Sequence, residues 1–166
     1  GCSREEALRC CYENSRDNAR TPMQWTDDEN AGFTDGTPWL AMNPNYRQIN
    51  VREQEVRTDS VLAYYRRLVH LRKADAYRET FTYGIFEPAY QEMADVFAYY
   101  RVSGESGQRI LVAANFGTDA VSLPLAYPCR QVLLSNLRAE SAVETACEKA
   151  NALTLESCEV AVIELG

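Results

Sequence analysis

The sequence predicts an α+β chain in two parts, with helices and a long loop over residues 1–78 and an all-β antiparallel sandwich over residues 79–166. Three observations carry this prediction: an amphipathic helix that ends near Lys73, an irregular loop before it, and a series of short strands after Thr80. With 166 residues and an apolar fraction of 46%, the chain can bury a sizeable core.

The first helix is predicted from a capping box. Ser3 and Glu6 have the spacing at which a serine hydroxyl and a glutamate carboxylate cap one helix start, and the helix then continues to about Tyr12. Pro22 disfavours helix for the residue before it, so a short extended segment is predicted over residues 21–25.

A loop of about 25 residues is predicted between Thr26 and Asn50, where turn-forming residues crowd together. Loops of this length inside a compact domain are usually functional or disordered. Phe33, Trp39 and Tyr46 are spread through the loop, which favours a packed conformation.

The clearest helix is predicted to start at a cap formed by Thr58 or Asp59 and to end near Lys73. Its last turn carries Arg72 and Lys73, as the helix dipole favours. An apolar stripe at helical spacing indicates that this helix packs on something large. The stripe consists of Val61, Leu62, Tyr65, Leu68 and Val69.

Six strands are predicted in the second part, because short runs of β-forming residues alternate with turn signals such as Ser103-Gly104. Strands of this length and spacing are typical of an antiparallel sandwich. Residues 140–150 are acidic and poor in large apolar side chains, and they stay unassigned. The predicted strands are 96–102, 109–116, 120–125, 131–135, 152–155 and 158–165.

Charge and hydropathy exclude two classes of partner. The formal net charge of −7 opposes binding to a phosphate backbone or an anionic membrane. No apolar run approaches the roughly 20 residues that are needed to span a bilayer. We therefore expect neither nucleic acid nor a membrane as a partner.

The six cysteines, at positions 2, 10, 11, 129, 147 and 158, are predicted to be reduced and mostly buried in a cytoplasmic protein. The chain is long and apolar enough to fold without disulfides, and it has no Cys-x-x-Cys pair for zinc or redox chemistry. The cluster Asp27-Asp28-Glu29 lacks the alternating spacing of a calcium loop and is interpreted as a solvated turn. No cofactor and no metal are expected.

One motif indicates a family. Residues 16–25 read RDNARTPMQW, and this run resembles a signature of oligo-1,6-glucosidases and their relatives in glycoside hydrolase family thirteen of the α-amylase superfamily. Those relatives include trehalose-6-phosphate hydrolases, dextran glucosidases, maltases and sucrose isomerases. The resemblance continues in order through residues 30–34, 38–39, 43–46, 49–51, 59–61, 64–65 and 71–73. The similarity is weaker at 97–99 and 111–116.

The resemblance implies a specific fold. Members of this family have a (β/α)8 barrel followed by an antiparallel β-sandwich called domain C. By resemblance, residues 1–78 would be the last strand of the barrel, its long following loop and its last helix. Residues 79–166 would be domain C, which agrees with the division read from the sequence pattern.

The resemblance also implies that no catalytic residue lies in this chain. Retaining glycosidases need two carboxylates roughly 5 to 5.5 Å apart, and in this family both come from strands upstream of the RDNARTPMQW motif. The family uses two active-site histidines, whereas this sequence has only His70, which is interpreted as a helix-surface or structural residue. Asp59 matches the Arg-x-Asp spacing around the family's nucleophile, but it opens a helix and is interpreted as a cap.

Substrate contact is expected from Arg20. By resemblance it would lie in the loop after the last barrel strand, at the rim of the sugar pocket, where a guanidinium offers five fixed donors. The alternative is an arginine that ties this loop to a barrel carboxylate. Arg16 is interpreted as structural, and for Phe33 and Trp39 anchoring of the loop is favoured over stacking on a sugar.

We therefore expect the C-terminal portion of an α-glucosidase that hydrolyses terminal α-glucosidic bonds of short oligosaccharides by a retaining mechanism. Its partners would be the α-glucoside substrate and the missing barrel portion of the same protein, and the chain alone would be inactive. The absence of Met at Gly1 indicates a truncation or cloning boundary.

Two alternatives remain. One is a stand-alone, non-catalytic β-sandwich that binds a glucan or a protein. The other is a non-catalytic homologue like the transporter-associated heavy chains of this superfamily, which carry a membrane span. If the chain is a piece of a barrel protein, an open sheet edge and an apolar helix face are left uncovered, so self-association or a loosely held segment 1–50 is expected.

Overall fold

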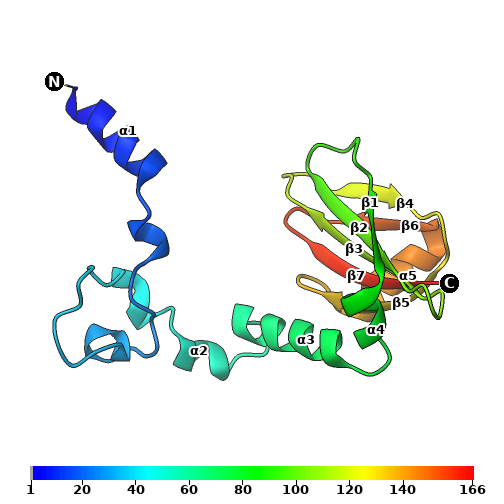
Figure 1. Cartoon of the computed structure of the whole chain (residues 1–166), viewed down its shortest axis with the longest axis horizontal. Helices are drawn as coiled ribbons and strands as arrows, with labels where there is room; N and C mark the ends of the chain where they lie inside the picture. Colours follow the sequence, from blue (N-terminus) through cyan, green and yellow to red (C-terminus); the bar gives the residue numbers. More distant parts are fainter. Residues whose placement is uncertain (1) are drawn as a thin grey trace. The chain divides into compact units, whose positions relative to one another are not determined.

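The structure is a computed structural model that describes residues 2–166, apart from the side chain of Asn18 (Figure 1). Gly1, on which the predicted N-terminal boundary rests, lies outside the described residues. The chain divides into two compact units, of which the first ends at Tyr64 and the second begins at Tyr65. In the described residues, no helix combines the length and the apolar composition needed to cross a membrane.

The first unit begins with helix α1, Arg4–Asn14, and the predicted capping box is confirmed. The Glu6 amide donates to the Ser3 hydroxyl at 3.2 Å, and the Ser3 amide donates to the Glu6 carboxylate at 2.8 Å. The helix runs two residues beyond the predicted end. None of its residues is buried, so α1 is held by its cap and its own backbone hydrogen bonds rather than by packing.

The rest of the first unit is one closed loop with short helical turns. At its neck, the Val51 and Arg52 amides donate to the Gln24 and Trp25 carbonyls at 2.9 and 3.0 Å. No strand is formed in residues 2–84, because the extended segment that begins at Thr21 has no neighbouring strand to pair with. The helical turns are η1 (Asp17–Ala19), η2 (Glu29–Gly32), η3 (Pro44–Arg47) and α2 (Val51–Glu55).

The loop is packed, as predicted, but its anchor is Ala31 rather than an aromatic residue. Ala31 is fully buried, and its carbonyl accepts hydrogen bonds from the Trp25 and Thr26 amides at 2.9 and 3.0 Å. Its φ of 54° is in the left-handed region, where a non-glycine residue is strained by about 1 to 2 kcal/mol. Phe33 and Trp39, the predicted anchors, are exposed.

Helix α3, Val61–Lys73, is capped by Ser60, so the predicted cap at Thr58 or Asp59 is wrong. The Ser60 hydroxyl accepts from the Ala63 amide at 3.1 Å and donates to the Gln54 carbonyl at 2.8 Å. Asp59 forms an ion pair with Arg57 instead, with two contacts of 3.0 Å. The cap is Ser60, one residue after Asp59, because its buried hydroxyl reaches both the start of α3 and the Gln54 carbonyl in the preceding turn.

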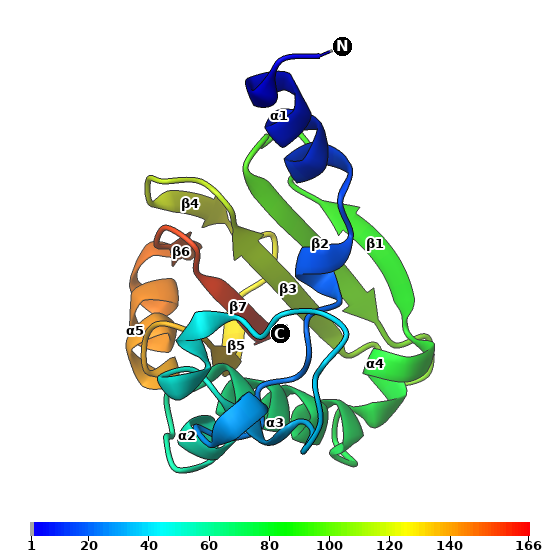
Figure 2. The ribbon, with the colours of Figure 1, turned by 90° about the vertical axis from the view of Figure 1, so that its left-hand side faces the viewer.

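The second unit is built on a five-stranded antiparallel sheet in the order β1-β2-β3-β7-β5. Figure 2 shows β1, β2, β3 and β7 side by side. A second sheet pairs β4 with β6. The strands are β1 (Ile85–Ala89), β2 (Val96–Val102), β3 (Arg109–Asn115), β4 (Val121–Pro124), β5 (Cys129–Ser135), β6 (Ala152–Leu155) and β7 (Val160–Leu165).

Each of the six predicted strands is present, whereas β1, helix α4 (Arg78–Tyr83) and helix α5 (Glu140–Ala150) were not predicted. The hydrophobic core of this unit combines residues from both sheets and from α5. It includes Leu111, Ala113 and Ile163 of the large sheet, Leu123 and Leu153 of the small sheet, and Val143 and Cys147 of α5.

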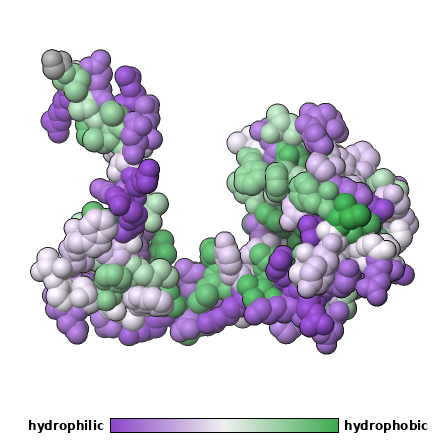
Figure 3. Space-filling model, in the orientation of Figure 1, coloured by the Kyte–Doolittle hydropathy of each residue, from purple (hydrophilic) through white to green (hydrophobic). Residues whose placement is uncertain are grey.

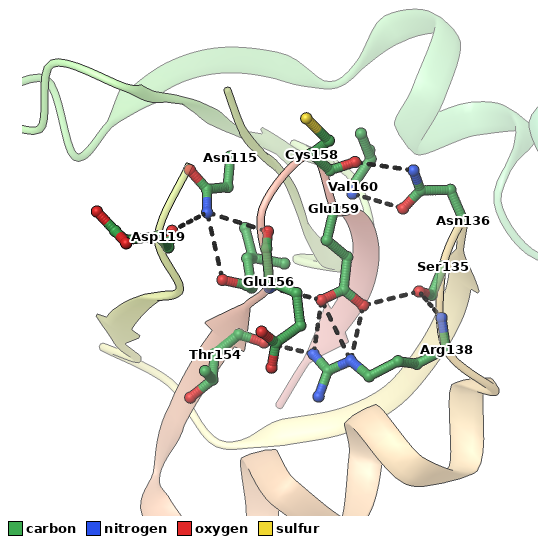
Figure 4. Close-up of polar contacts among 11 residues, drawn as sticks. Asn115, Asp119, Ser135, Asn136, Arg138, Thr154, Glu156, Cys158, Glu159 and Val160 are labelled. Carbon is green, nitrogen blue, oxygen red and sulfur yellow. Dashed lines mark hydrogen bonds and ion pairs between the residues drawn. The ribbon is translucent and has the colours of Figure 1, made fainter. Parts of the chain in front are cut away.

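A buried carboxylate at the start of β7 ties three segments of the second unit together (Figure 4). Glu159 is fully buried and accepts hydrogen bonds from Arg138 Nη2 at 2.8 Å, from the Ser135 hydroxyl at 3.1 Å and from the Glu156 amide at 2.8 Å. Nearby, the Asn115 amide donates to backbone carbonyls on either side of the strand ends, including that of Glu156 at 3.0 Å. The network fixes the turn between β6 and β7.

Apolar side chains also lie on the surface of each unit (Figure 3). In α3 no residue is buried, and Val61, Tyr65 and Val69 of the predicted apolar stripe are exposed by 67%, 61% and 46%. Leu62 and Leu68 of the stripe are half-buried, so within the described residues the predicted packing of this face on a large surface is only partly formed.

None of the six cysteines forms a disulfide in the described residues, and the prediction that they are mostly buried is wrong. Only Cys147 is buried and Cys129 half-buried. The other four lie in the polar helix α1 or in segments next to chain turns, where no core is available. They are Cys2, Cys10, Cys11 and Cys158.

Candidate functional site

The candidate site is centred on Arg20, at the end of η1. The Arg20 amide donates to the Asp17 carbonyl at 3.0 Å, and its Nη2 donates to Asp17 Oδ1 at 2.6 Å. The guanidinium carbon also lies 5.4 Å from the centroid of the Trp39 ring. The structure thus brings together an arginine and a carboxylate of the RDNARTPMQW motif and an indole from the later block at residues 38–39.

The Arg20 side chain is half exposed, at 52%, and its partner Asp17 at 56%. An ion pair between two such exposed groups contributes only about 0 to 1 kcal/mol to stability. The pair therefore orients the guanidinium more than it stabilises the fold. Because arginine has five N–H donors and one of them contacts Asp17, donors remain to bind hydroxyl groups.

Gln24 holds the loop that presents Arg20. Its side-chain amide donates to Asn45 Oδ1 at 3.1 Å and also to the Ile49 carbonyl. Asn50 is buried, donates to the Tyr46 carbonyl at 2.9 Å and accepts from the Glu53 amide at 2.9 Å. The motif blocks that are separated in the sequence therefore meet at the neck of one loop.

Two residues of the acidic cluster at 27–29 are ion-paired, so its interpretation as a solvated turn is incomplete. Arg52 donates to Asp27 Oδ1 and to Asp28 Oδ2, both at 2.9 Å. The Thr26 hydroxyl bonded to Asp28, and then Arg52, lower the pKa of Asp28 below its ordinary value. Sequence reasoning missed Arg52 because it is 24 residues away from Asp28 and has no local signal.

The other candidate residues are placed as follows. Arg16 precedes η1, and its carbonyl accepts from the Ala19 amide at 3.0 Å, while its side chain is exposed. Trp39 contacts Arg20 and is 70% exposed. His70 lies on the exposed surface of α3, as predicted.

Within residues 2–166, apart from the side chain of Asn18, no three His, Cys, Asp or Glu side chains gather in a way that could hold a metal ion.

Comparison with known proteins places these features in a family. The family described as "Alpha amylase, catalytic domain" matches residues 2–84. An oligo-1,6-glucosidase from Parageobacillus thermoglucosidasius is 38% identical over 144 residues, which are 84% of this chain and 25% of that protein. A glucan 1,6-alpha-glucosidase from Streptococcus pneumoniae is 39% identical over 140 residues, again 84% of this chain and 25% of that protein.

Two solved structures are similar over almost the whole chain. The trehalulose synthase of Pseudomonas mesoacidophila MX-45 has a TM-score of 0.83 and 31% identity, covering 99% of this chain and 28% of the synthase. The isomaltulose synthase of Klebsiella sp. LX3 has a TM-score of 0.76 and 34% identity, covering 92% and 26%. The chain therefore spans about a quarter of the length of these relatives.

Proposed function

Because the chain belongs to the α-amylase family, we propose that it is the C-terminal portion of an α-glucosidase. In this proposal residues 1–78 complete a (β/α)8 barrel with its last strand, long loop and last helix, and residues 79–166 form the domain C sandwich. Two findings support it: the family match ends at residue 84, and the first strand of the antiparallel sheet begins at Ile85.

The proposed reaction is the hydrolysis of terminal α-glucosidic bonds in short oligosaccharides, with retention of configuration. The names of the relatives support the substrate class, since they act on 1,6-linked glucosides. The two carboxylates that retention requires would come from the part of the protein that precedes this chain. The chain alone is then inactive, and its partners are the α-glucoside and the barrel portion of its own protein.

Arg20 is the residue that we propose to contact the substrate. The observation that carries this role is its geometry, because Asp17 and Trp39 hold the guanidinium half exposed at the surface of the closed loop. A guanidinium between a carboxylate and an aromatic ring is suited to bind a sugar, whose hydroxyls accept hydrogen bonds and whose C–H face packs on indole.

The test is Arg20→Ala in the intact enzyme, with kcat/KM measured on isomaltose. Loss of a charged hydrogen bond of about 1.5 to 3 kcal/mol should lower kcat/KM roughly 10- to 150-fold. Arg78→Ala is the matched control, because Arg78 is an exposed arginine of the second unit that pairs with Asp75, three residues before it. An unchanged kcat/KM for the Arg20 variant would refute the contact.

One observation favours a second function, that of a glucan-binding module. Phe86, Tyr99 and Phe97 form a row of contacting rings on β1 and β2, with centroids 5.0 and 5.7 Å apart. Phe97 and Tyr99 point to one face of β2, whereas Ala98 and Tyr100 point to the core. Phe86 and Phe97 are exposed and Tyr99 is half-buried, so the row offers ring surface on which a sugar can stack.

The module hypothesis predicts that the isolated chain binds isomaltotriose, as followed by NMR shift changes. Phe97→Ala should abolish those changes. Tyr83→Ala, which removes an exposed ring outside the row, should leave them intact. If the unmodified chain shows no shift changes at millimolar sugar, the module hypothesis fails.

We also propose that the protein works in the cytoplasm. Six cysteines without a disulfide are expected where thiols are kept reduced. Measuring enzyme activity in separated cell fractions tests the location, and activity confined to the secreted fraction would contradict it.

A further inference from the structure

One peptide bond in the loop of the first unit joins an aspartate to a glycine. Asp35 and Gly36 lie between η2 and η3, and the sequence contains no other Asp-Gly pair and no Asn-Gly pair. Both residues are exposed, and neither belongs to a helix or a strand. The pair is therefore in contact with water, in a segment that is free of the regular hydrogen bonding of helices and strands.

The chemistry of such a pair follows from the missing side chain of glycine. The amide nitrogen of a glycine can reach Cγ of the aspartate that precedes it, and the attack closes a five-membered ring. The reaction is intramolecular, because both reacting atoms belong to neighbouring residues of one chain. Ring closure needs a rotation of the backbone at the aspartate that takes it away from helix and strand values, so it is favoured in a loop.

The structure shows that Gly36 is open to this attack. Outside its chain neighbours, a Cβ added to Gly36 would meet within 4 Å only the Thr34 hydroxyl oxygen, at 3.7 Å. The φ of Gly36 is not in the left-handed region, in contrast to the φ of Gly32 at 63°. The backbone therefore does not require glycine at this position, and the effect of glycine here is an unshielded amide nitrogen.

Two hydrogen bonds hold Gly36 in the folded loop. Its amide donates to Thr34 Oγ1 at 3.1 Å, and its carbonyl accepts from Asn30 Nδ2 at 3.1 Å. Trp39 follows three residues later and contacts the guanidinium of Arg20. A chemical change at Gly36 therefore acts on the segment that carries Trp39.

We propose that Asp35 is a site of spontaneous isomerisation, at which its bond to Gly36 moves from the main-chain carbonyl to the side-chain carboxyl. The product is an isoaspartyl residue, with one extra methylene in the main chain and a free α-carboxylate. Methyltransferases that use S-adenosylmethionine to esterify such carboxylates would take it as a substrate. The proposal is independent of the glycosidase function, because it rests on the chemistry of the loop alone.

The reaction needs no partner except water. The Gly36 nitrogen bonds to Asp35 Cγ and gives up its proton, while the carboxyl group takes up a proton and loses water, which leaves a succinimide. Water then adds to the main-chain carbonyl carbon of Asp35, and the bond from that carbon to the Gly36 nitrogen breaks. One water is released and one is consumed, so the mass of the chain does not change.

The isoaspartyl product does not fit the loop in its present form. The added methylene moves Gly36 relative to Thr34 and Asn30, so the two hydrogen bonds of 3.1 Å cannot both be kept. Trp39 should then lose its contact with Arg20, which has the guanidinium carbon 5.4 Å from the ring centroid. Isomerisation is therefore expected to loosen the part of the loop that holds Trp39.

The test incubates the full chain at pH 7.4 and 37 °C and then adds a purified isoaspartyl methyltransferase with labelled S-adenosylmethionine. Trypsin cleaves after Arg20 and Arg47, so Asp35 falls in the peptide of residues 21–47. The expected result is label that increases with incubation time. Fragmentation in the mass spectrometer should place the isoaspartyl residue at Asp35, without the increase in mass that deamidation of an asparagine gives.

Asp35→Glu is the matched control, because it keeps the charge but would have to close a less favourable six-membered ring. The isoaspartyl residue in peptide 21–47 should be lost in this variant. Gly36→Ala should fold normally, because its Cβ makes only an ordinary contact, and it should form isoaspartate more slowly. Asp59 is an internal control, since both of its carboxylate oxygens bond to Arg57 at 3.0 Å.

The loosening of the loop has its own measurement. The sequence has two tryptophans, so Trp25→Phe leaves Trp39 as the fluorescent one. Quenching of this fluorescence by acrylamide should increase as isoaspartate accumulates, and it should stay constant when Asp35→Glu is added. The proposal is overturned if the unmodified chain forms no isoaspartate at Asp35, or if the quenching does not change while isoaspartate accumulates there.

Discussion

At the scale of single residues, the contacts of Arg20 and Glu159 show what the sequence could and could not predict. Asp17 lies three residues before Arg20 in the same motif, so their ion pair is one that local sequence spacing can predict. Glu159 meets Arg138 from 21 residues away, and only the paired strands bring them together. Such long-range ion pairs leave no local pattern.

Glu159 makes the stability of the second unit dependent on pH. Burial alone raises the pKa of this carboxyl, but the hydrogen bonds from Arg138, the Glu156 amide and Ser135 outweigh burial and lower it below its ordinary value of 4.5. A lowered folded-state pKa means that the carboxylate stabilises the fold above about pH 4.5 and loses this effect as the pH falls through the folded-state pKa.

Glu159→Gln should therefore lower the free energy of unfolding by about 3 kcal/mol at pH 7, because Arg138 loses its charged partner. The loss should shrink toward pH 3. Urea unfolding at both pH values measures it, with Glu105→Gln in an exposed turn as the control. Equal losses at the two pH values would show that the charge of Glu159 is not the cause.

At the scale of elements, prediction succeeded where the sequence had strong alternation, an apolar stripe or a helix-capping signal, and failed for β1, α4 and α5, where these signals are weak or missing. The strand β1 contains Pro88 and lies at the sheet edge, where a missing N–H is tolerated. The helix α5 buries only Val143 and Cys147, one turn apart, which is too weak a stripe to recognise. Local sequence patterns therefore do not distinguish an edge strand, or a helix that packs on the outside of a sheet, from a loop.

The cap of α3 yields a prediction that distinguishes Ser60 from Thr58 as the capping residue. Ser60→Ala should lower the free energy of unfolding by about 1 kcal/mol, because the Ala63 amide loses its acceptor. Thr58→Ala should change it by less than about 0.5 kcal/mol. Urea unfolding followed by far-UV circular dichroism measures both variants, and an equal loss for the two would contradict the assignment of the cap to Ser60.

At the scale of the whole molecule, the two-part organisation was predicted from the change in sequence character. The contact-based units divide at Tyr64, whereas the predicted domain boundary at residue 78 follows the change from helices to strands and stays a prediction. The later part of α3 contributes to the second unit, for example through the ion pair of Arg67 with Glu140. By its sequence, helix α3 was therefore assigned to the first predicted part, whereas its later residues belong to the second compact unit.

The exposed apolar residues predict that the isolated chain self-associates. Tyr65 and Val69 on α3 and Phe86 on the edge strand β1 are exposed, and surfaces of this kind associate in water. Light scattering after size-exclusion chromatography should give a mass above 18.8 kDa that falls with dilution. Tyr65→Lys with Val69→Lys should reduce it. A monodisperse monomer at all concentrations would contradict the expectation.

The most direct test of the central claim is the coding sequence upstream of Gly1. Since 144 matched residues are 25% of an oligo-1,6-glucosidase, we predict roughly 400 further residues in frame, with two catalytic carboxylates and two histidines of a barrel. A stop codon followed by a start site immediately before Gly1 would instead make the chain a stand-alone protein, and the α-glucosidase proposal would be contradicted.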